Sequence, residues 1–170
     1  MAATKLAPNP PSESLVMFIY PSISADGLGR LIGWIMNAIP LPFTKNVKLS
    51  ALIFGLPLAP VGLLLYVVQK IFGHRYVLTN RSLQVWSSIG QRLVGSVPLG
   101  QIADISVVER KGQEFFRAAD LEVLDAGGNV ALTLPGVPRA EVFRQIILKA
   151  RDAHTQVEAA LATIGARHGA

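Results

Sequence analysis

Apolar residues follow two patterns along the chain, a long unbroken run and then a series of short alternating segments. The run from Leu49 to Gln69 carries no charge, and about twenty apolar residues span a bilayer as a helix. The apolar segment before it, residues 31–44, is shorter and contains one asparagine and two prolines, so spanning, re-entrant and interfacial placements all fit it. We predict a transmembrane hairpin over residues 27–72 with residues 45–48 as its turn. A single crossing and a buried core helix are the alternatives.

Alternation of apolar and polar residues begins after Gly73 and predicts short β-strands. The segment 83–87 alternates as a half-buried strand does. Gly127 and Gly128 supply the positive φ that a hairpin turn requires. The charged stretch 109–119 predicts a loop. Strands are expected at residues 75–79, 83–87, 92–97, 102–108, 121–124 and 130–134.

A helix is predicted to close the domain. Residues 135–138 contain two prolines, which are expected to break the strand pattern and to start the helix. Glu141 would complement the helix dipole in its first turn. The apolar residues that follow recur at helical spacing, so one face can cover an open side of a curved antiparallel sheet; they are Val142, Phe143, Ile146, Ile147, Ala150, Val157, Leu161 and Ile164.

The composition and charge of the chain indicate that a membrane is its expected partner. Hydrophobic residues make up 51% of the 170 residues and charged residues 16%, whereas about a quarter of a soluble domain is charged. The net charge is +5 and the pI near 9.9, which suits an anionic bilayer beside an apolar anchor. More Lys and Arg residues follow Lys70 than lie in the predicted turn, which favours a cytoplasmic C-terminal domain on an integral cell-membrane protein.

Two sets of side chains are candidates for binding. Five basic residues lie just after the long apolar run or in the first strands, where they are predicted to contact the membrane surface or, alternatively, to be ordinary charges flanking a helix end. Two adjacent aromatics in the loop 109–119 are predicted to contact a partner or to pack into the end of the barrel. The sets are Lys70, His74, Arg75, Arg81 and Arg92, and Phe115 with Phe116.

No motif points to catalysis. The chain has no cysteine and only three scattered histidines, and it lacks both a nucleophile elbow and a phosphate-binding loop. Asp104 and Glu109 are expected on opposite faces of a strand. We expect no catalytic residue, no metal and no cofactor. From Lys70 onward, 12 Lys or Arg residues face 9 Asp or Glu residues, which argues against nucleic-acid binding.

Several segments, taken in order, resemble bacterial membrane-anchored pleckstrin-homology (PH) domain proteins. Arg75 to Leu83, RYVLTNRSL, is similar to their opening motif, and Val97-Pro98-Leu99 with Ile102 and Ile105 to the next one. Residues 119–147, with a Gly-Gly turn and the segment Leu134-Pro135-Gly136-Val137, look like their last hairpin and helix. Residues 13–22 resemble the strand that these proteins place before two membrane helices.

The resemblance implies an α+β fold that is mainly β, a curved antiparallel PH-like barrel capped by a C-terminal helix and preceded by the transmembrane hairpin. The expected order is a disordered tail (1–12), a strand or entry segment (13–26), the hairpin anchor (27–72), the PH-like domain (73–153) and a helical extension with a tail (154–170). Phosphoinositide-binding relatives hold a basic cluster in the first strand pair, where this chain offers only Arg75, Arg81 and Arg92.

The function that the resemblance implies is a membrane-anchored binding or scaffold module that assists the assembly or organisation of another membrane protein. The alternative is a lipid-binding sensor at the membrane surface. The expected partners are therefore the lipid bilayer and another membrane protein, and a homo-oligomer is compatible with the sequence. An enzyme acting at the interface is a weaker alternative, because the sequence lacks the nucleophile and metal motifs described above.

Overall fold

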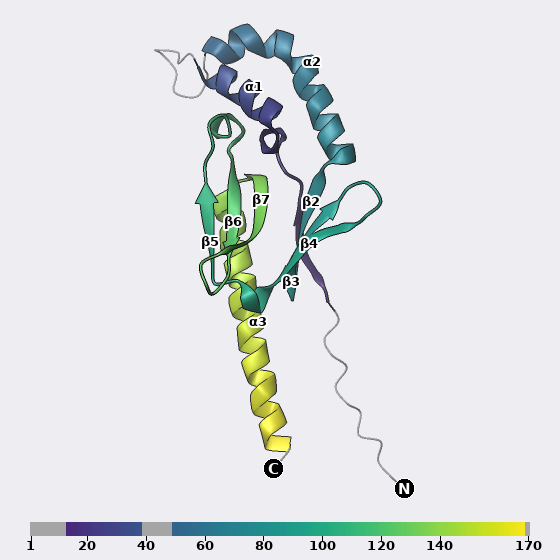
Figure 1. Ribbon diagram of the computed structural model, residues 1–170, viewed down its shortest axis with the longest axis vertical. Coiled ribbons are helices and arrows are strands. Elements are labelled where there is room, and N and C mark those ends of the chain that lie inside the picture. The colour runs from purple at the N-terminus through teal and green to yellow at the C-terminus, as the bar shows by residue number, and fades with distance from the viewer. Residues whose placement is uncertain (1–12, 39–48, 169–170) are drawn as a thin grey trace.

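The computed structural model describes residues 13–38 and 49–168. Two antiparallel sheets, two helices above them and one long C-terminal helix make up the fold (Figure 1). The first sheet has the order β1-β2-β3-β4 and the second the order β5-β6-β7. The strands are β1 (Leu15–Ile19), β2 (His74–Thr79), β3 (Ser82–Ser87), β4 (Leu93–Pro98), β5 (Asp104–Val108), β6 (Ala118–Leu124) and β7 (Val130–Pro138). The helices are α1 (Gly27–Asn37), α2 (Leu49–Phe72) and α3 (Ala140–His168), with short 3-10 turns η1 (Ile23–Ala25), η2 (Leu99–Gln101) and η3 (Glu114–Phe116).

The hydrophobic core lies between the sheets and the first half of α3. Phe143 and Ile147 of α3 are fully buried against inward-facing side chains of both sheets, as expected when an amphipathic helix covers a curved sheet. The prediction of a mainly β fold with a C-terminal helix is confirmed. The sheet residues of this core include Tyr76, Leu78, Leu83, Val85, Val97, Ile105, Leu121, Val123 and Leu134.

The N-terminal strand belongs to the first sheet. β1 pairs with β2 in antiparallel register, from Leu15 opposite Thr79 to Ile19 opposite Tyr76. The whole helical segment is therefore inserted between two neighbouring strands (Figure 1). The β domain thus begins before the helices, rather than at residue 73 as the sequence predicted.

Strand β7 runs four residues past its predicted end at Leu134, through both prolines to Pro138. Pro138 pairs with Ala118 and Val137 with Ala119. Prolines are tolerated because β7 is an edge strand of its sheet, where a missing N–H breaks no second ladder. Between them, Gly136 adopts a φ of +64°, a conformation that glycine reaches without steric cost. The helix therefore begins at Ala140 and not within residues 135–138.

Helices α1 and α2 pack against each other above the sheets, with α2 curving over α1 (Figure 1). Pro57 and Pro60 lie inside α2, and interior prolines bend helices. Among the residues that the structure describes, no helix is both long enough and apolar enough to cross a membrane. The predicted turn at residues 45–48 lies outside the described residues, and so does the predicted tail at residues 1–12.

A single residue, Gly73, joins α2 to β2. Its N–H donates to the Gln69 carbonyl at 2.8 Å and so closes the last turn of the helix. A β-carbon on Gly73 would collide with that same carbonyl group, so glycine is required at this position.

Helix α3 is continuous from Ala140 to His168, with no break at the predicted boundary between residues 153 and 154. Its first half covers the core, and its second half projects beyond both sheets (Figure 1). Val157 and Leu161 on this projecting half are exposed.

Candidate binding surface

Four of the five predicted basic residues lie at one end of the first sheet, next to the end of α2. Lys70 is in the last turn of α2, and His74 begins β2 opposite Ser87. The N–H of Ser87 donates to the Arg92 carbonyl at 2.8 Å, which fixes Arg92 at the same end. Arg75 is adjacent to His74 on β2. We call Lys70, His74, Arg75 and Arg92 the basic rim.

Arg81 lies apart from this rim, in the turn between β2 and β3. β2 begins at His74 and ends at Thr79, two residues before Arg81, so at about 3.3 Å per residue the strand alone separates His74 from Arg81 by roughly 17 Å. The Arg81 carbonyl accepts the Leu99 N–H at 2.8 Å, so this turn lies near η2. The sequence grouped the five residues because all of them lie close after the long apolar run, although the predicted strands 75–79 and 83–87 already place Arg81 in the turn at the far end of the first one.

Two residues of the basic rim, Lys70 and Arg75, contact aromatic side chains. The Nζ of Lys70 lies 5.6 Å from the ring centre of Tyr66 and 3.5 Å from its hydroxyl. The guanidinium of Arg75 lies 5.8 Å from the Trp86 ring centre, a cation–π distance. The Nε of Arg75 is buried and has no hydrogen-bond partner among the described residues. Buried polar atoms normally have a partner, so Arg75 retains an unused donor.

The outer face of the first sheet carries an aromatic surface beside Arg75. Trp86 donates its Nε1–H to Gln84 Oε1 at 2.8 Å, which fixes the indole. Phe18 and Tyr20 stack edge to face with ring centres 6.0 Å apart. Together they surround a shallow pocket of about 370 Å³, lined by Leu15, Phe18, Tyr20, Arg75, Val77, Gln84 and Trp86. We call these seven residues the aromatic face.

Glu13 fastens the beginning of β1 to this face. Its Oε1 accepts hydrogen bonds from Ser82 Oγ at 2.7 Å, Thr79 Oγ1 at 2.8 Å and Gln84 Nε2 at 2.9 Å. These bonds, the one from Ser82 first and then the one from Thr79, hold the pKa of Glu13 below its ordinary value because they favour the carboxylate. Arg81 adds to the effect through its charge. The N-terminal strand is thereby attached to the β2–β3 turn.

Phe115 and Phe116 lie in η3, at the end of the β5–β6 connection and far from the aromatic face. Their rings meet edge to face at 5.0 Å, with Phe115 exposed. Phe116 contacts α1, since a β-carbon on Gly33 would lie 2.7 Å from Phe116 Cε2. Of the two predicted roles, packing describes Phe116, and Phe115 stays a candidate partner contact. The predicted loop at residues 109–119 thus contains a 3-10 turn and the first two residues of β6.

A buried polar network holds this connection in place. Asp120 accepts hydrogen bonds from Arg110 Nε at 2.6 Å, Gln113 Nε2 at 2.5 Å and the Gly136 N–H at 2.8 Å. Both Gln113 and Asp120 are buried. Nearby, the Tyr76 hydroxyl donates to the Pro135 carbonyl at 2.7 Å, and burial, with the charge of Asp120 second, raises the pKa of Tyr76 far above its usual range. These contacts join the β5–β6 connection to β6 and β7 and have a structural role.

The model of one protein family, described as "Bacterial PH domain", matches residues 28–151. The chain belongs to this family. The resemblance noted in the sequence is therefore confirmed, and membership supports a binding or scaffold module. Comparisons with curated proteins and with solved structures gave no match.

The match defines which parts of this bacterial PH domain protein are shared with its family. It begins inside α1 and ends in α3 at residue 151, so the helical insertion belongs to the family unit together with β2 to β7. β1 and the projecting half of α3 lie outside the matched residues. Both of these elements carry exposed apolar residues beside the matched domain.

Sequence reasoning missed most of the aromatic face of this PH domain protein. Alternation in residues 83–87 could have placed Gln84 and Trp86 on one side of β3. Phe18 and Tyr20 could not be added, because nothing local says that β1 pairs with a strand some sixty residues later. Among the described residues, no three His, Asp or Glu side chains gather as a metal site.

Proposed function

We propose that this bacterial PH domain protein is a membrane-attached binding module. In this proposal the apolar surface of α1 and α2 enters the bilayer, the basic rim lies at the lipid headgroups, and the aromatic face of the first sheet engages another membrane protein. The β domain stands on the cytoplasmic side, and the protein acts by binding rather than by catalysis.

The exposed surface of α2 is the observation that carries the proposal. Its large apolar side chains after Pro60 are exposed in nearly every direction around the helix. A helix that is apolar all round needs apolar surroundings. Only Lys70 is charged within α2, and it lies at the end next to the basic rim. The exposed residues are Val61, Leu63, Leu64, Tyr66, Val67, Val68, Ile71 and Phe72.

The aromatic face supports the scaffold role. Large aromatics and arginine are the residues that most often dominate protein interfaces. Phe18 and Tyr20 are exposed, and the Arg75 guanidinium, 5.8 Å from the Trp86 ring centre, adds a positive charge to the surface. The positive charge of Arg75, next to His74 in the basic rim, also favours the second candidate function, recognition of an anionic lipid headgroup.

Vesicle flotation with the full-length chain tests membrane attachment. The chain, purified in mild detergent, is diluted into neutral or anionic vesicles. We expect it to float with both and to bind anionic vesicles more tightly. Lys70→Gln and Arg92→Gln should each reduce the anionic preference about fivefold, since a basic residue at such a surface contributes roughly 1 kcal/mol. A chain that stays with the buffer in every case would remove the proposal.

Arg81→Gln is the matched control for this measurement. It removes the same charge from a turn that is likewise exposed, at the far end of β2. If Arg81→Gln reduced the anionic preference as much as Arg92→Gln, the membrane would not be located at the basic rim. Co-purification in mild detergent then separates the two functions, because a stoichiometric membrane protein supports the scaffold and bound lipid alone supports the sensor.

A further inference from the structure

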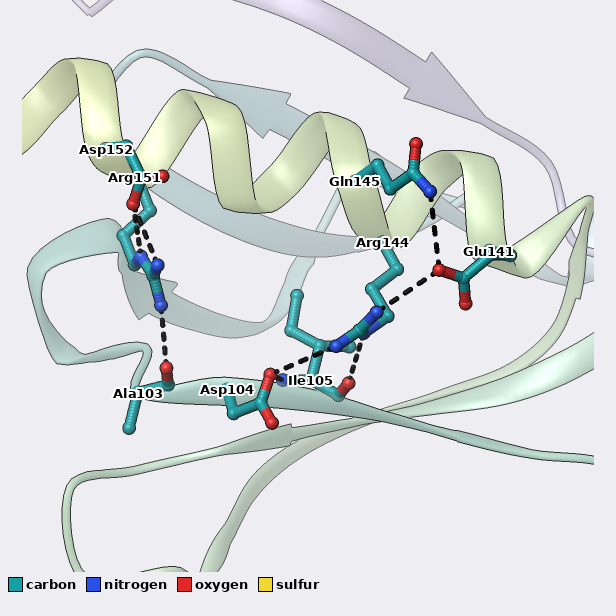
Figure 2. Close-up of polar contacts among 8 residues, drawn as sticks. All are labelled: Ala103, Asp104, Ile105, Glu141, Arg144, Gln145, Arg151 and Asp152. Carbon is teal, nitrogen blue, oxygen red and sulfur yellow. Dashed lines mark hydrogen bonds and ion pairs between the residues drawn. The ribbon is translucent and has the colours of Figure 1, made fainter.

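Helix α3 lies between two sheet edges, and one of them is closed by arginine side chains (Figure 2). Arg144 Nε donates to the Ile105 carbonyl of β5 at 2.7 Å, and Arg151 Nη1 donates to the Ala103 carbonyl at 2.6 Å. The Ile105 N–H is bonded to the carboxylate of Asp104 at 2.8 Å. The Ala103 carbonyl and both backbone groups of Ile105, at the beginning of this edge, are thus already bonded to side chains.

The two arginines are themselves fixed by carboxylates. Arg144 pairs with Glu141 at 3.2 Å and Asp104 at 3.4 Å, and Arg151 pairs with Asp152 at 2.8 Å. Figure 2 shows these pairs side by side along α3. Charged side chains over an edge strand prevent pairing with another strand. These side chains therefore block the pairing of a partner strand with the beginning of β5.

The edge on the other side of α3 is open. β1 is the outermost strand of its sheet, and in the described part of the chain no backbone group pairs with its outer edge. Its inner edge pairs with β2, and beyond the ends of the strand the Ser14 N–H donates to Asn80 Oδ1 and the Ser22 N–H to the Gly136 carbonyl. Residues Leu15–Phe18 between them are exposed and apolar. An exposed apolar edge is a template for an added strand.

A groove of about 990 Å³ separates this edge from α3. One wall is the apolar stripe of α3, which continues the core-facing side of the helix past the end of the sheets. The other wall is formed by β1 and by residues near the β2–β3 turn. Apolar residues from both walls include Val16, Pro98, Ile146, Ala153, Val157 and Leu161.

The polar rim of the groove has an excess of positive charge. Arg81 and Lys149 line it. Neither is in a described salt bridge, but the Glu13 carboxylate is close enough to Arg81 for that charge to lower the pKa of Glu13. The one carboxylate among the lining residues, Glu158, lies 3.6 Å from His154. A carboxylate on an incoming segment would therefore meet two cations.

We propose that this groove binds an extended segment of a partner protein. The segment adds a strand to the outer edge of β1, sets alternate apolar side chains against α3 and directs a carboxylate to Arg81 and Lys149. Backbone pairing supplies affinity and the alternate side chains supply selectivity in this mode of recognition. A second copy of β1 fits less well, because Leu15–Ile19 contains no carboxylate. The inference rests on the proposed binding role but not on membrane attachment.

Fluorescence anisotropy with a labelled synthetic peptide tests the inference. The probe is a short peptide in which valine alternates with threonine and both ends are glutamate. The control peptide has the same sequence with lysine at both ends. It is titrated with the full-length chain in neutral detergent micelles, without lipid. We expect the glutamate peptide to bind more tightly than the lysine peptide, and Arg81→Glu to reverse that order.

Substitutions on α3 localise the binding. Val157→Asp should weaken the glutamate peptide about tenfold or more, because it removes an apolar contact and adds a repelling charge. Val142→Asp is the matched control, the same change on the same helix at equal exposure, 55% against 53%, but about 22 Å away along the axis. Circular dichroism checks that both variants retain the fold. Equal losses from both variants would overturn the proposal.

Hydrogen exchange gives a second readout that does not depend on side chains. The bound peptide should slow exchange of amides in residues 15–19, because a strand added at the edge occupies them. Protection confined to another strand, or no binding of either peptide, would refute the proposal that the groove binds an extended segment. Self-association abolished by Val157→Asp, with no peptide binding, would assign the groove to a second copy instead. Since no lipid is present, each of these failures leaves the vesicle result intact.

Discussion

Replacing Gly33 with alanine tests how closely α1 lies on the β5–β6 connection. A β-carbon at this position would overlap the Gly112 carbonyl oxygen and would lie 2.7 Å from Phe116 Cε2. The first obstacle is backbone, so it cannot move aside by a change of rotamer. Overpacking of this kind costs about 1–3 kcal/mol. In Gly33→Ala, the packing of α1 on the β5–β6 connection should therefore be weaker by about 1–3 kcal/mol.

Gly27→Ala provides the reference for this change. Gly27 is in the same helix, and a β-carbon added to it would have nothing within 4 Å. Alanine stabilises a helix interior by about 1 kcal/mol relative to glycine. Both variants therefore gain helix stability from the substitution itself. The difference between them then reports the collision.

Amide hydrogen exchange of residues 28–38 measures the difference. Exchange through local opening follows the free energy of that opening, so 1–3 kcal/mol corresponds to roughly five- to hundredfold faster exchange in Gly33→Ala than in Gly27→Ala. The segment 110–116 should exchange faster as well, because it loses its cover. Identical protection in the two variants would refute the close packing of α1 on the loop.

Three further predictions concern the polar contacts inside the β domain. Asp120→Ala should lower the free energy of unfolding by about 2–4 kcal/mol in urea titrations, because it leaves the buried Gln113 amide without its acceptor; Asp120→Asn, which keeps one oxygen, should lose less. Tyr76→Phe should cost about 1–2 kcal/mol in the same titration, because the Pro135 carbonyl loses its donor, and an unchanged midpoint would contradict that bond. The lowered pKa of Glu13 means that its hydrogen bonds stabilise the fold above the unfolded pKa and that this contribution is lost as the pH falls through the folded value. Thermal melts between about pH 6 and pH 3 should therefore show a smaller acid-induced drop in Glu13→Gln than in the unchanged chain.

Local patterns in the sequence were enough to predict most strands. The β-prone residues of 75–79 and the alternation in 83–87 marked β2 and β3 within one residue of their ends. The end of β7 was wrong, because the rule that proline stops a strand holds for central strands and β7 is an edge strand. Its continuation depends on the Gly136 N–H reaching Asp120, a contact between residues sixteen positions apart.

Long-range pairing explains what local patterns could not predict. The partner of β1 is β2, beyond both helices. Local patterns therefore could not place the strand expected within residues 13–26 in the first sheet, and the part of the aromatic face that β1 supplies was missed. The close packing of Gly29 and Gly33 against the Ile23 and Gly112 carbonyl groups also depends on residues outside α1, so the pattern of the helix does not reveal it.

The single-residue link at Gly73 makes the helices and the first sheet one mechanical unit. Helix α2 ends at Phe72 and β2 begins at His74, so the joint contains no length of chain that could absorb a rotation. A change in the tilt of α2 must either turn β2 with it or break the Gly73–Gln69 hydrogen bond. A change in the tilt of α2 would thus move the first sheet as well, and with it the groove and the projecting half of α3.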